Sequence, residues 1–169
     1  PSAQEKGSAS VNAIVQRVQD ILLRPRSTWP VIDTEAGDAA GLYRRYLAVL
    51  AALPALAGFI GLSLVGVSAF GVRYRVPWAT GLLSAAASYV LTLAMLFGLA
   101  LLADVLAPTF GGRRSRWQAL KLVGYASTAA FVAGLFNIVP ALSLLGVLAA
   151  LYSFYLVWLG APVLMGCPP

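Results

Sequence analysis

Two long runs of apolar residues dominate the pattern of hydrophobic and polar positions along the chain. Residues 47–72 and residues 76–103 contain no charged side chain. A helix needs about 20 mostly apolar residues to cross the hydrocarbon layer of a membrane. Both runs exceed this length, and neither has the polar stripe that a water-facing helix of a soluble protein shows. The pattern therefore predicts a polytopic membrane protein built from helices.

Four segments have the length and hydropathy of membrane spans, namely residues 46–70, 79–106, 119–139 and 142–164. The third segment is the most polar, and residues 137–141 join it to the fourth. Because Pro140 cannot continue a helical hydrogen-bond ladder, we expect a tight hairpin turn there. The predicted fold class is all-α: a transmembrane helical bundle of about four spans over residues 46–169, preceded by a cytoplasmic segment over residues 1–45.

A shorter amphipathic pattern lies near the N-terminus, over residues 11–23. Its apolar positions repeat at the spacing of one helical face, with Ile14, Val18 and Ile21 at its centre. Ser10 suits the N-cap, and Pro25 ends the pattern. This helix is too short to span a membrane, so we expect it to lie along the cytoplasmic surface with this face against lipid or a partner. Packing of the same face on the protein's own loops is the alternative.

The next segment, RPRSTWP at residues 24–30, has the composition of a membrane surface. Arg24 and Arg26 are long enough to reach lipid phosphates, and Trp29 is expected to anchor at headgroup depth. The acidic residues that follow Pro30 are expected to form a linker that turns the chain toward the first span.

Composition and charge agree with this class and add an orientation. The chain is 60% hydrophobic and 11% charged, with a net charge of +6, whereas a soluble domain carries about 25% charged residues. Basic residues gather before the first span and between the second and third spans, while the loop after the first span has only Arg73 and Arg75. Cytoplasmic loops are enriched in Lys and Arg. We therefore predict a cytoplasmic N-terminus. The high content of alanine, leucine and arginine, with only two lysines, suggests a GC-rich bacterial genome, so the expected location is a bacterial inner membrane.

The same basicity has a rival interpretation as nucleic-acid binding. No basic stripe with interleaved aromatic residues occurs outside the loops, so no nucleic-acid partner is expected. The expected partners are the lipid bilayer and other integral membrane proteins, or further copies of this chain.

The residues offer little for catalysis. The chain has no histidine, and no phosphate-binding glycine motif of the Walker or dinucleotide type. Five of its six acids precede the first span. The single Cys167 excludes an internal disulfide and gives no zinc site. We predict no enzyme activity, no cofactor and no metal.

Asp104 is an ionisable residue inside the second predicted span, which makes it a candidate functional group. Lys121 lies in the third span at a similar depth, about 6 Å below the cytoplasmic edge at a rise of 1.5 Å per residue. We expect the two to form a structural clasp between the spans. A proton or ion site at Asp104 is the alternative.

The order of several short motifs resembles the bacterial branch of the YIP family, the Ypt/Rab-interacting-protein membrane domain. These motifs are Pro25, Trp29 and Ile32 in a P-x-x-x-W-x-x-I element, KLVGYAST at 121–128, the IVP turn at 138–140, and YSFYLVWLGAPVLMGCPP at 152–169. The resemblance implies a helical membrane domain of five spans, a cytoplasmic N-terminus and no known catalytic chemistry. Only four spans precede Pro169, so a fifth is either beyond this residue or missing.

Eukaryotic relatives in the family are associated with vesicle traffic and with small GTPases of the Rab type. The Asp-Leu-Tyr-Gly-Pro motif of that branch is absent here, so GTPase binding is not expected. The resemblance implies a scaffold, adaptor or accessory subunit that organises membrane proteins or lipids. The alternative is a small transporter or channel subunit, lined by Asp104, Ser84 and Ser88.

The charge asymmetry predicts that Tyr74 faces the extracytoplasmic side and Ser115 the cytoplasm. Single cysteines at these two positions, with Cys167 replaced, would be probed on intact cells with a membrane-impermeant thiol reagent. We expect labelling at position 74 only. Labelling at 115 but not at 74 would reverse the orientation.

Overall fold

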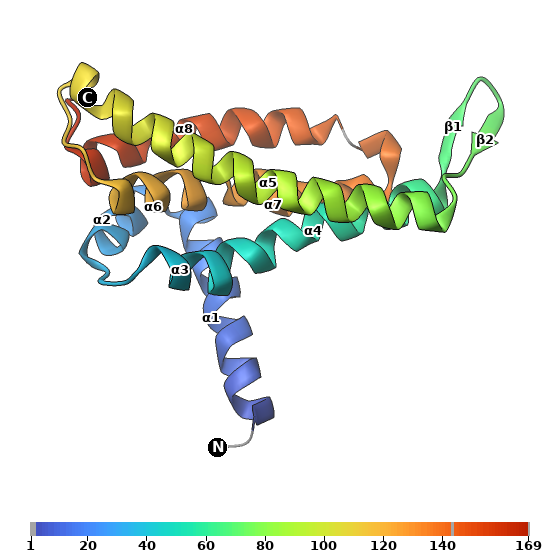
Figure 1. The fold of residues 1–169 in the computed structure, drawn as a ribbon, viewed down its shortest axis with the longest axis horizontal. Coiled ribbons are helices and arrows are strands. Elements are labelled where there is room, and N and C mark those ends of the chain that lie inside the picture. The colour runs from blue at the N-terminus through green and yellow to red at the C-terminus, as the bar shows by residue number, and fades with distance from the viewer. Residues whose placement is uncertain (1–2, 143, 169) are drawn as a thin grey trace.

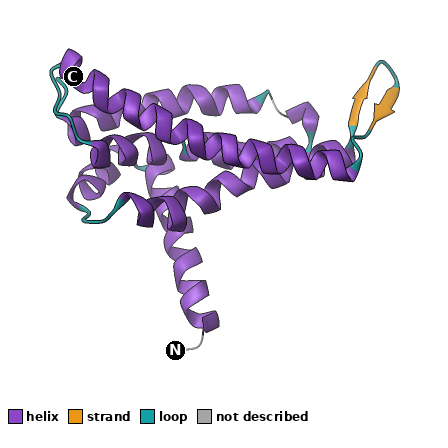
Figure 2. Cartoon of the chain, viewed as in Figure 1, coloured by secondary structure: helices purple, strands orange, loops and turns teal. Residues whose placement is uncertain are grey.

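The computed structural model describes residues 3–142 and 144–168, and in this part the chain is almost entirely helical (Figure 2). Four helical segments are long and apolar enough to cross a membrane, which confirms the predicted all-α bundle of spans. They run alongside one another to form an elongated body (Figure 1). The four segments are Ala39–Val65, Trp78–Phe110, Arg116–Ile138 and Leu145–Met165.

The first span begins earlier and ends earlier than the hydropathy suggests. It consists of α3 (Ala39–Leu42), the π-helical turn η1 (Tyr43–Leu47), α4 (Ala48–Phe59) and a second π-helical turn, η2 (Ile60–Val65). Asp38 caps its start, since the Asp38 carboxylate accepts a hydrogen bond from the backbone N–H of Gly41 at 3.2 Å.

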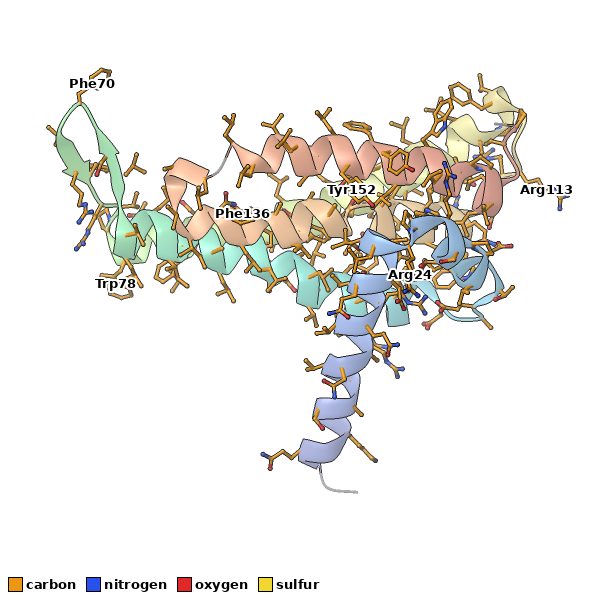
Figure 3. All side chains as sticks on the ribbon, turned by 180° about the vertical axis from the view of Figure 1, so that it is seen from behind. Arg24, Phe70, Trp78, Arg113, Phe136 and Tyr152 are labelled. Carbon is orange, nitrogen blue, oxygen red and sulfur yellow. The ribbon has the colours of Figure 1, made fainter. Side chains whose placement is uncertain are left out.

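A β-hairpin replaces the predicted end of the first span. Strands β1 (Val67–Ala69) and β2 (Val72–Tyr74) pair antiparallel, and Phe70 and Gly71 form the turn with φ of 50° and 80°. Positive φ at both central residues is typical of a tight hairpin turn. Phe70 projects from the tip of the hairpin, at the opposite end of the molecule from Arg113 (Figure 3). The apolar run VGVSAFGV concealed this hairpin in the sequence, because its hydropathy continues that of the span.

The remaining spans follow the predicted order. The second span is α5 (Trp78–Leu106), extended by the 3₁₀ turn η3 (Ala107–Phe110). The third span contains α6, α7 and a 3₁₀ turn, and a further 3₁₀ turn leads to α8, the fourth span. Their bounds are Arg116–Ala126 for α6, Thr128–Ala133 for α7, Gly134–Ile138 for η4, Pro140–Leu142 for η5 and Leu145–Met165 for α8.

The third span is the centre of the bundle. The first, second and fourth spans all pack against it. In its most apolar stretch 72% of the residues are buried within the protein, compared with 28%, 22% and 17% in the other three spans. This position explains why the third span tolerates polar residues, because its side chains meet protein and not lipid. Thr128, for example, is fully buried, and its hydroxyl shares a 2.8 Å hydrogen bond with the hydroxyl of Tyr46 in the first span.

The N-terminal region forms two helices. Helix α1 (Ala3–Leu23) starts before the predicted N-cap at Ser10 and continues through it. It runs crosswise to the four spans and projects away from them (Figure 1). Pro25 ends α1 as predicted, and it then opens a second helix, α2 (Pro25–Thr34), where the sequence suggested a membrane-surface segment followed by an acidic linker. Proline is well suited to the first position of a helix, since its fixed φ is helical and no N–H is lost there.

Helix α2 is embedded in the protein. It packs against α8, and its Trp29 and Ile32 are 1% and 0% exposed. Gly160 in α8 permits this approach, because a Cβ at that position would lie 2.8 Å from the Trp29 ring and 2.6 Å from Cδ1 of Leu122. The close contact between Trp29 and Gly160 therefore fixes α2 against the fourth span.

We predict that Gly160→Ala lowers the free energy of unfolding by about 1–3 kcal/mol, the usual cost of an overpacked core. Gly146→Ala in the same helix is the matched control, because a Cβ at Gly146 meets nothing within 4 Å and alanine favours a helix by up to about 1 kcal/mol. Thermal unfolding in detergent measures both. Equal stability of the two variants would contradict the contact.

Candidate functional site

Several of the residues chosen from the sequence, Lys121, Trp29 and Ile21 among them, lie where α1 and α2 meet the bundle, which we call the N-terminal seat. At its centre the ammonium of Lys121 in α6 donates to the carbonyl oxygens of Ile32 at 2.8 Å, Asp33 at 3.1 Å and Glu35 at 3.4 Å. The last carbonyls of a helix have no partner within the helix and carry its negative dipole end. The C-terminus of α2 therefore supplies a ready acceptor set for a buried cation.

This arrangement, the lysine clasp, satisfies a group that is costly to bury. Lys121 is 1% exposed, and an ammonium removed from water needs hydrogen bonds to every donor. Its three N–H groups match the three carbonyls in number. The ammonium also lies 5.2 Å from the centre of the Trp117 ring, a cation–π distance,. The clasp thus ties α2 to the central span.

Further polar bonds join α1 and α2 to each other and to the spans. Gln118 donates to the carboxylate of Asp33 at 2.7 Å. Arg17 of α1 forms an ion pair with Glu35 and lies over the ring of Tyr125, 5.8 Å from its centre. The polar side chains of the seat are therefore engaged in holding helices together.

The junction between α1 and α2 is held from two sides. The Thr28 hydroxyl is placed to donate to two carbonyl oxygens near it, those of Arg24 at 2.8 Å and Asp20 at 3.0 Å. Tyr152 of α8 donates to the carbonyl oxygen of Leu22 at 2.6 Å. Two of these carbonyls, those of Asp20 and Leu22, belong to α1 and lie in its last turn. Carbonyls there have no hydrogen-bond partner within the helix. The end of α1 is consequently fixed to the fourth span.

The predicted apolar face of α1 is covered only near its end. Ile21 is 0% exposed, and Ile14 and Val18 are half-buried against the core. Toward the N-terminus, Val11 and Val15 are 57% and 48% exposed. This end of the helix therefore packs on the protein itself, mainly against the helices α2 and α7. The outer part of the face has no cover within the described residues.

The three predicted surface anchors differ in their exposure. Arg24 and Arg26 are exposed, in keeping with a surface position. Trp29 is in the core, so its expected role at headgroup depth is wrong. The prediction placed residues 24–30 at the membrane surface and treated the acidic residues after Pro30 as a linker, whereas in the helix α2 the side chains of Trp29 and Ile32 are both buried.

Asp104 and Lys121 are both buried, but the predicted pair between them is not formed among the described residues. One carboxylate oxygen of Asp104 lies 3.7 Å from the guanidinium of Arg114, in the loop before α6. Its other oxygen is buried and has no hydrogen-bond partner in the described part of the chain. The prediction rested on depth alone and did not account for the face of each helix: the Lys121 ammonium bonds to the end of α2, and the loop before α6 brings Arg114 to Asp104.

Ser84 and Ser88 lie elsewhere. Together with Thr92 and Asn137 they line a cavity of about 260 Å³ between α4, α5 and η4. Asp104 is about 16 residues beyond Ser88, or about 24 Å along a helix. Asp104 is not among the residues that line this cavity. Among the described residues no cluster of His, Cys, Asp or Glu could hold a metal ion.

Comparison with known proteins agrees with the motifs and the fold. The profile of the Yip1 domain family matches residues 20–169. The chain belongs to the Yip1 family. This match confirms the resemblance, and its range includes α2 and all four spans.

Two curated relatives are inner membrane proteins named YohC, from Escherichia coli strains K12 and O6:H1 CFT073. Each is 28% identical to this chain over 155 residues, which cover 88% of this chain and 78% of the relative. No solved structure matches the chain.

The geometry predicts that Lys121 and Asp104 act independently. Lys121→Met should lower the free energy of unfolding by about 1–3 kcal/mol, because it leaves buried carbonyls without a donor. Asp104→Asn should change it by at most about 1 kcal/mol, since the Arg114 guanidinium is largely exposed, and the double variant should be additive within about 0.5 kcal/mol. Thermal unfolding in detergent gives all three values.

Lys6→Met is the matched control for the lysine clasp, because Lys6 is exposed on α1. Its effect should stay within about 0.5 kcal/mol. If the double variant departs strongly from additivity, Asp104 and Lys121 interact directly, which would contradict the arrangement described here.

Proposed function

We propose that the protein is a non-enzymatic scaffold or adaptor of the bacterial inner membrane, with its N-terminus in the cytoplasm, and that it organises neighbouring membrane proteins or lipids. Membership of the Yip1 family and the inner-membrane location of the YohC relatives support this proposal. The basic residues at the seat end of the bundle support the orientation.

The observation that carries the proposal is the form of α1. Its last turns are fixed in the seat by Ile21 and by the Arg17–Glu35 ion pair, while its outer turns extend crosswise to the spans with Val11 and Val15 exposed (Figure 1). A helix that leaves the spans crosswise runs parallel to the plane of the membrane, and its exposed apolar stripe is in position to meet lipid or the flank of another membrane protein. Because the last turns of α1 are fixed in the seat, Val11 and Val15 keep a constant orientation relative to the spans. Such an orientation suits an adaptor.

The chemistry of the seat also favours association over catalysis. Lys121, Arg17, Glu35 and Gln118 are the polar groups that a reaction would need, and each is already bonded to another helix or its end. These bonds would have to break before the groups could transfer a proton or bind a substrate.

We predict that Val11→Ser with Val15→Ser removes partner or membrane-surface contact without unfolding the bundle, because both side chains are exposed. Ile21 is unsuitable for this test, since a serine there would disrupt the seat. Gln16→Ser with Gln19→Ser is the matched control on the exposed polar face of the same helix. Quantitative co-purification from native membranes, at matched expression and thermal stability, compares the three proteins.

We expect recovery of at least one native partner or lipid class to fall about tenfold or more in the valine variant. The reason is that burial of each apolar side chain contributes about 1.5–3 kcal/mol to binding when it is complete. The glutamine variant should match the wild type. Unchanged recovery in the valine variant would refute α1 as the adaptor element.

The cavity beside Ser84, Ser88 and Thr92 favours a second candidate, a transporter or channel subunit for a small neutral solute. Its hydroxyl and amide groups have no hydrogen-bond partner among the described residues, and no charged side chain lines it. Solute flux in proteoliposomes containing the purified chain separates the two functions. Flux that Ser88→Leu abolishes would replace the scaffold proposal.

A further inference from the structure

A pocket of about 330 Å³ opens next to the N-terminal seat, where the first and third spans begin. Turn η1 contributes three consecutive residues to its wall, Arg44, Arg45 and Tyr46, and the third span contributes Trp117 and Tyr125. We call this space the arginine pocket. π-Helical turns are rare, and those that occur are often found at functional sites. Turn η1 contributes two arginines, Arg44 and Arg45, to the lining of one pocket.

Five charged side chains line the arginine pocket, and three of them are already committed. Lys121 donates to the three carbonyls of the clasp, Glu35 pairs with Arg17, and Asp38 caps α3. The two that remain are Arg44 and Arg45.

No ion pair to Arg44 or Arg45 occurs within the described residues. Arg44 makes one long contact, from Nε to the carbonyl oxygen of Ala40 at 3.5 Å. Both residues are exposed, and both line the pocket. The guanidinium groups of Arg44 and Arg45 therefore have no carboxylate partner among the described residues. The same pocket is also lined by Trp117 and the buried Tyr46.

We infer that the arginine pocket binds the phosphate of an anionic phospholipid, held by Arg44 and Arg45. A guanidinium presents paired N–H donors that match phosphate oxygens, and such charge-assisted bonds are short and strong. Aromatic rings such as Trp117 are favoured where a lipid headgroup meets its apolar part. This site goes beyond the scaffold role and does not depend on it.

The position of the pocket favours lipid as the source of the phosphate. Arg44 is five residues into the first span, which starts at Ala39, so it lies about 8 Å from the helix start at 1.5 Å per residue. Trp117 is the second residue of the third span. Both therefore lie near the membrane surface, where phospholipid phosphates are concentrated and the surface potential attracts basic residues.

The test uses the full chain in a neutral detergent. Phosphatidylglycerol, zwitterionic phosphatidylcholine or inorganic phosphate is titrated, and binding is followed by the rise in melting temperature. The variant Arg44→Gln with Arg45→Gln is compared with Arg24→Gln with Arg26→Gln. The latter loses the same charge from exposed arginines outside the pocket, so general surface attraction falls equally in both. If the pocket variant melts lower without lipid, Arg45→Lys, which keeps the charge but not the paired donors, takes its place.

Phosphatidylglycerol should stabilise the wild type and the Arg24/Arg26 variant at similar concentrations, and phosphatidylcholine should be weaker. The Arg44/Arg45 variant should need about tenfold or more phosphatidylglycerol for the same shift, and Arg45→Lys should fall between it and the wild type. Equal weakening in both double variants would overturn the site, as would unchanged binding by the pocket variant. Inorganic phosphate as effective as phosphatidylglycerol would overturn the lipid source.

Discussion

Burial of the Lys121 ammonium near one end of an apolar bundle is the constraint on which the rest of the structure depends. A cation at this place needs a full set of acceptors, and the central span has none to spare because its own carbonyls bond within the helix. The end of α2 provides them through Ile32, Asp33 and Glu35. The N-terminal segment is therefore a necessary part of the membrane domain and not an appendage to it.

Several features follow once α2 is in place. Trp29 fills the space beside Gly160, the last turn of α1 is fixed by Tyr152, and the outer turns of α1 are directed away from the bundle. Glu35 links the two proposed functional elements. Its carboxylate pairs with Arg17 of α1, its carbonyl accepts from Lys121, and it also lines the arginine pocket. Helix α1 and the arginine pocket are thus connected through one residue, Glu35.

The sequence predicts the parts of this fold that depend on hydropathy and local chain chemistry. Four spans, the amphipathic helix before Pro25 and the family all follow from long-range apolar patterning or from short motifs in order. The hairpin was not predicted, because its apolar strands continue the hydropathy of the first span. Only Gly66 and Gly71 indicate a break in the helix.

The functional contacts were harder to predict, since they depend on which way each side chain faces. Trp29 between arginines and prolines has the composition of a membrane surface, yet a helix turns it inward. The sequence predicts similar depths for Asp104 and Lys121, yet their partners are Arg114 and the end of α2. No one-dimensional pattern states that a lysine bonds to backbone carbonyls about 90 residues earlier, because carbonyls carry no sequence signature.

Hydrogen–deuterium exchange of the intact protein in lipid nanodiscs tests the central claim most directly. Amides in the second half of α2, from Trp29 to Glu35, are the segment to follow, with α6 and the outer turns of α1 as internal references. If the clasp embeds α2, these amides should exchange as slowly as those of α6, while residues near Lys6 exchange quickly. Exchange of α2 at the rate of the outer turns of α1 would show that α2 lies on the surface, and it would contradict this account.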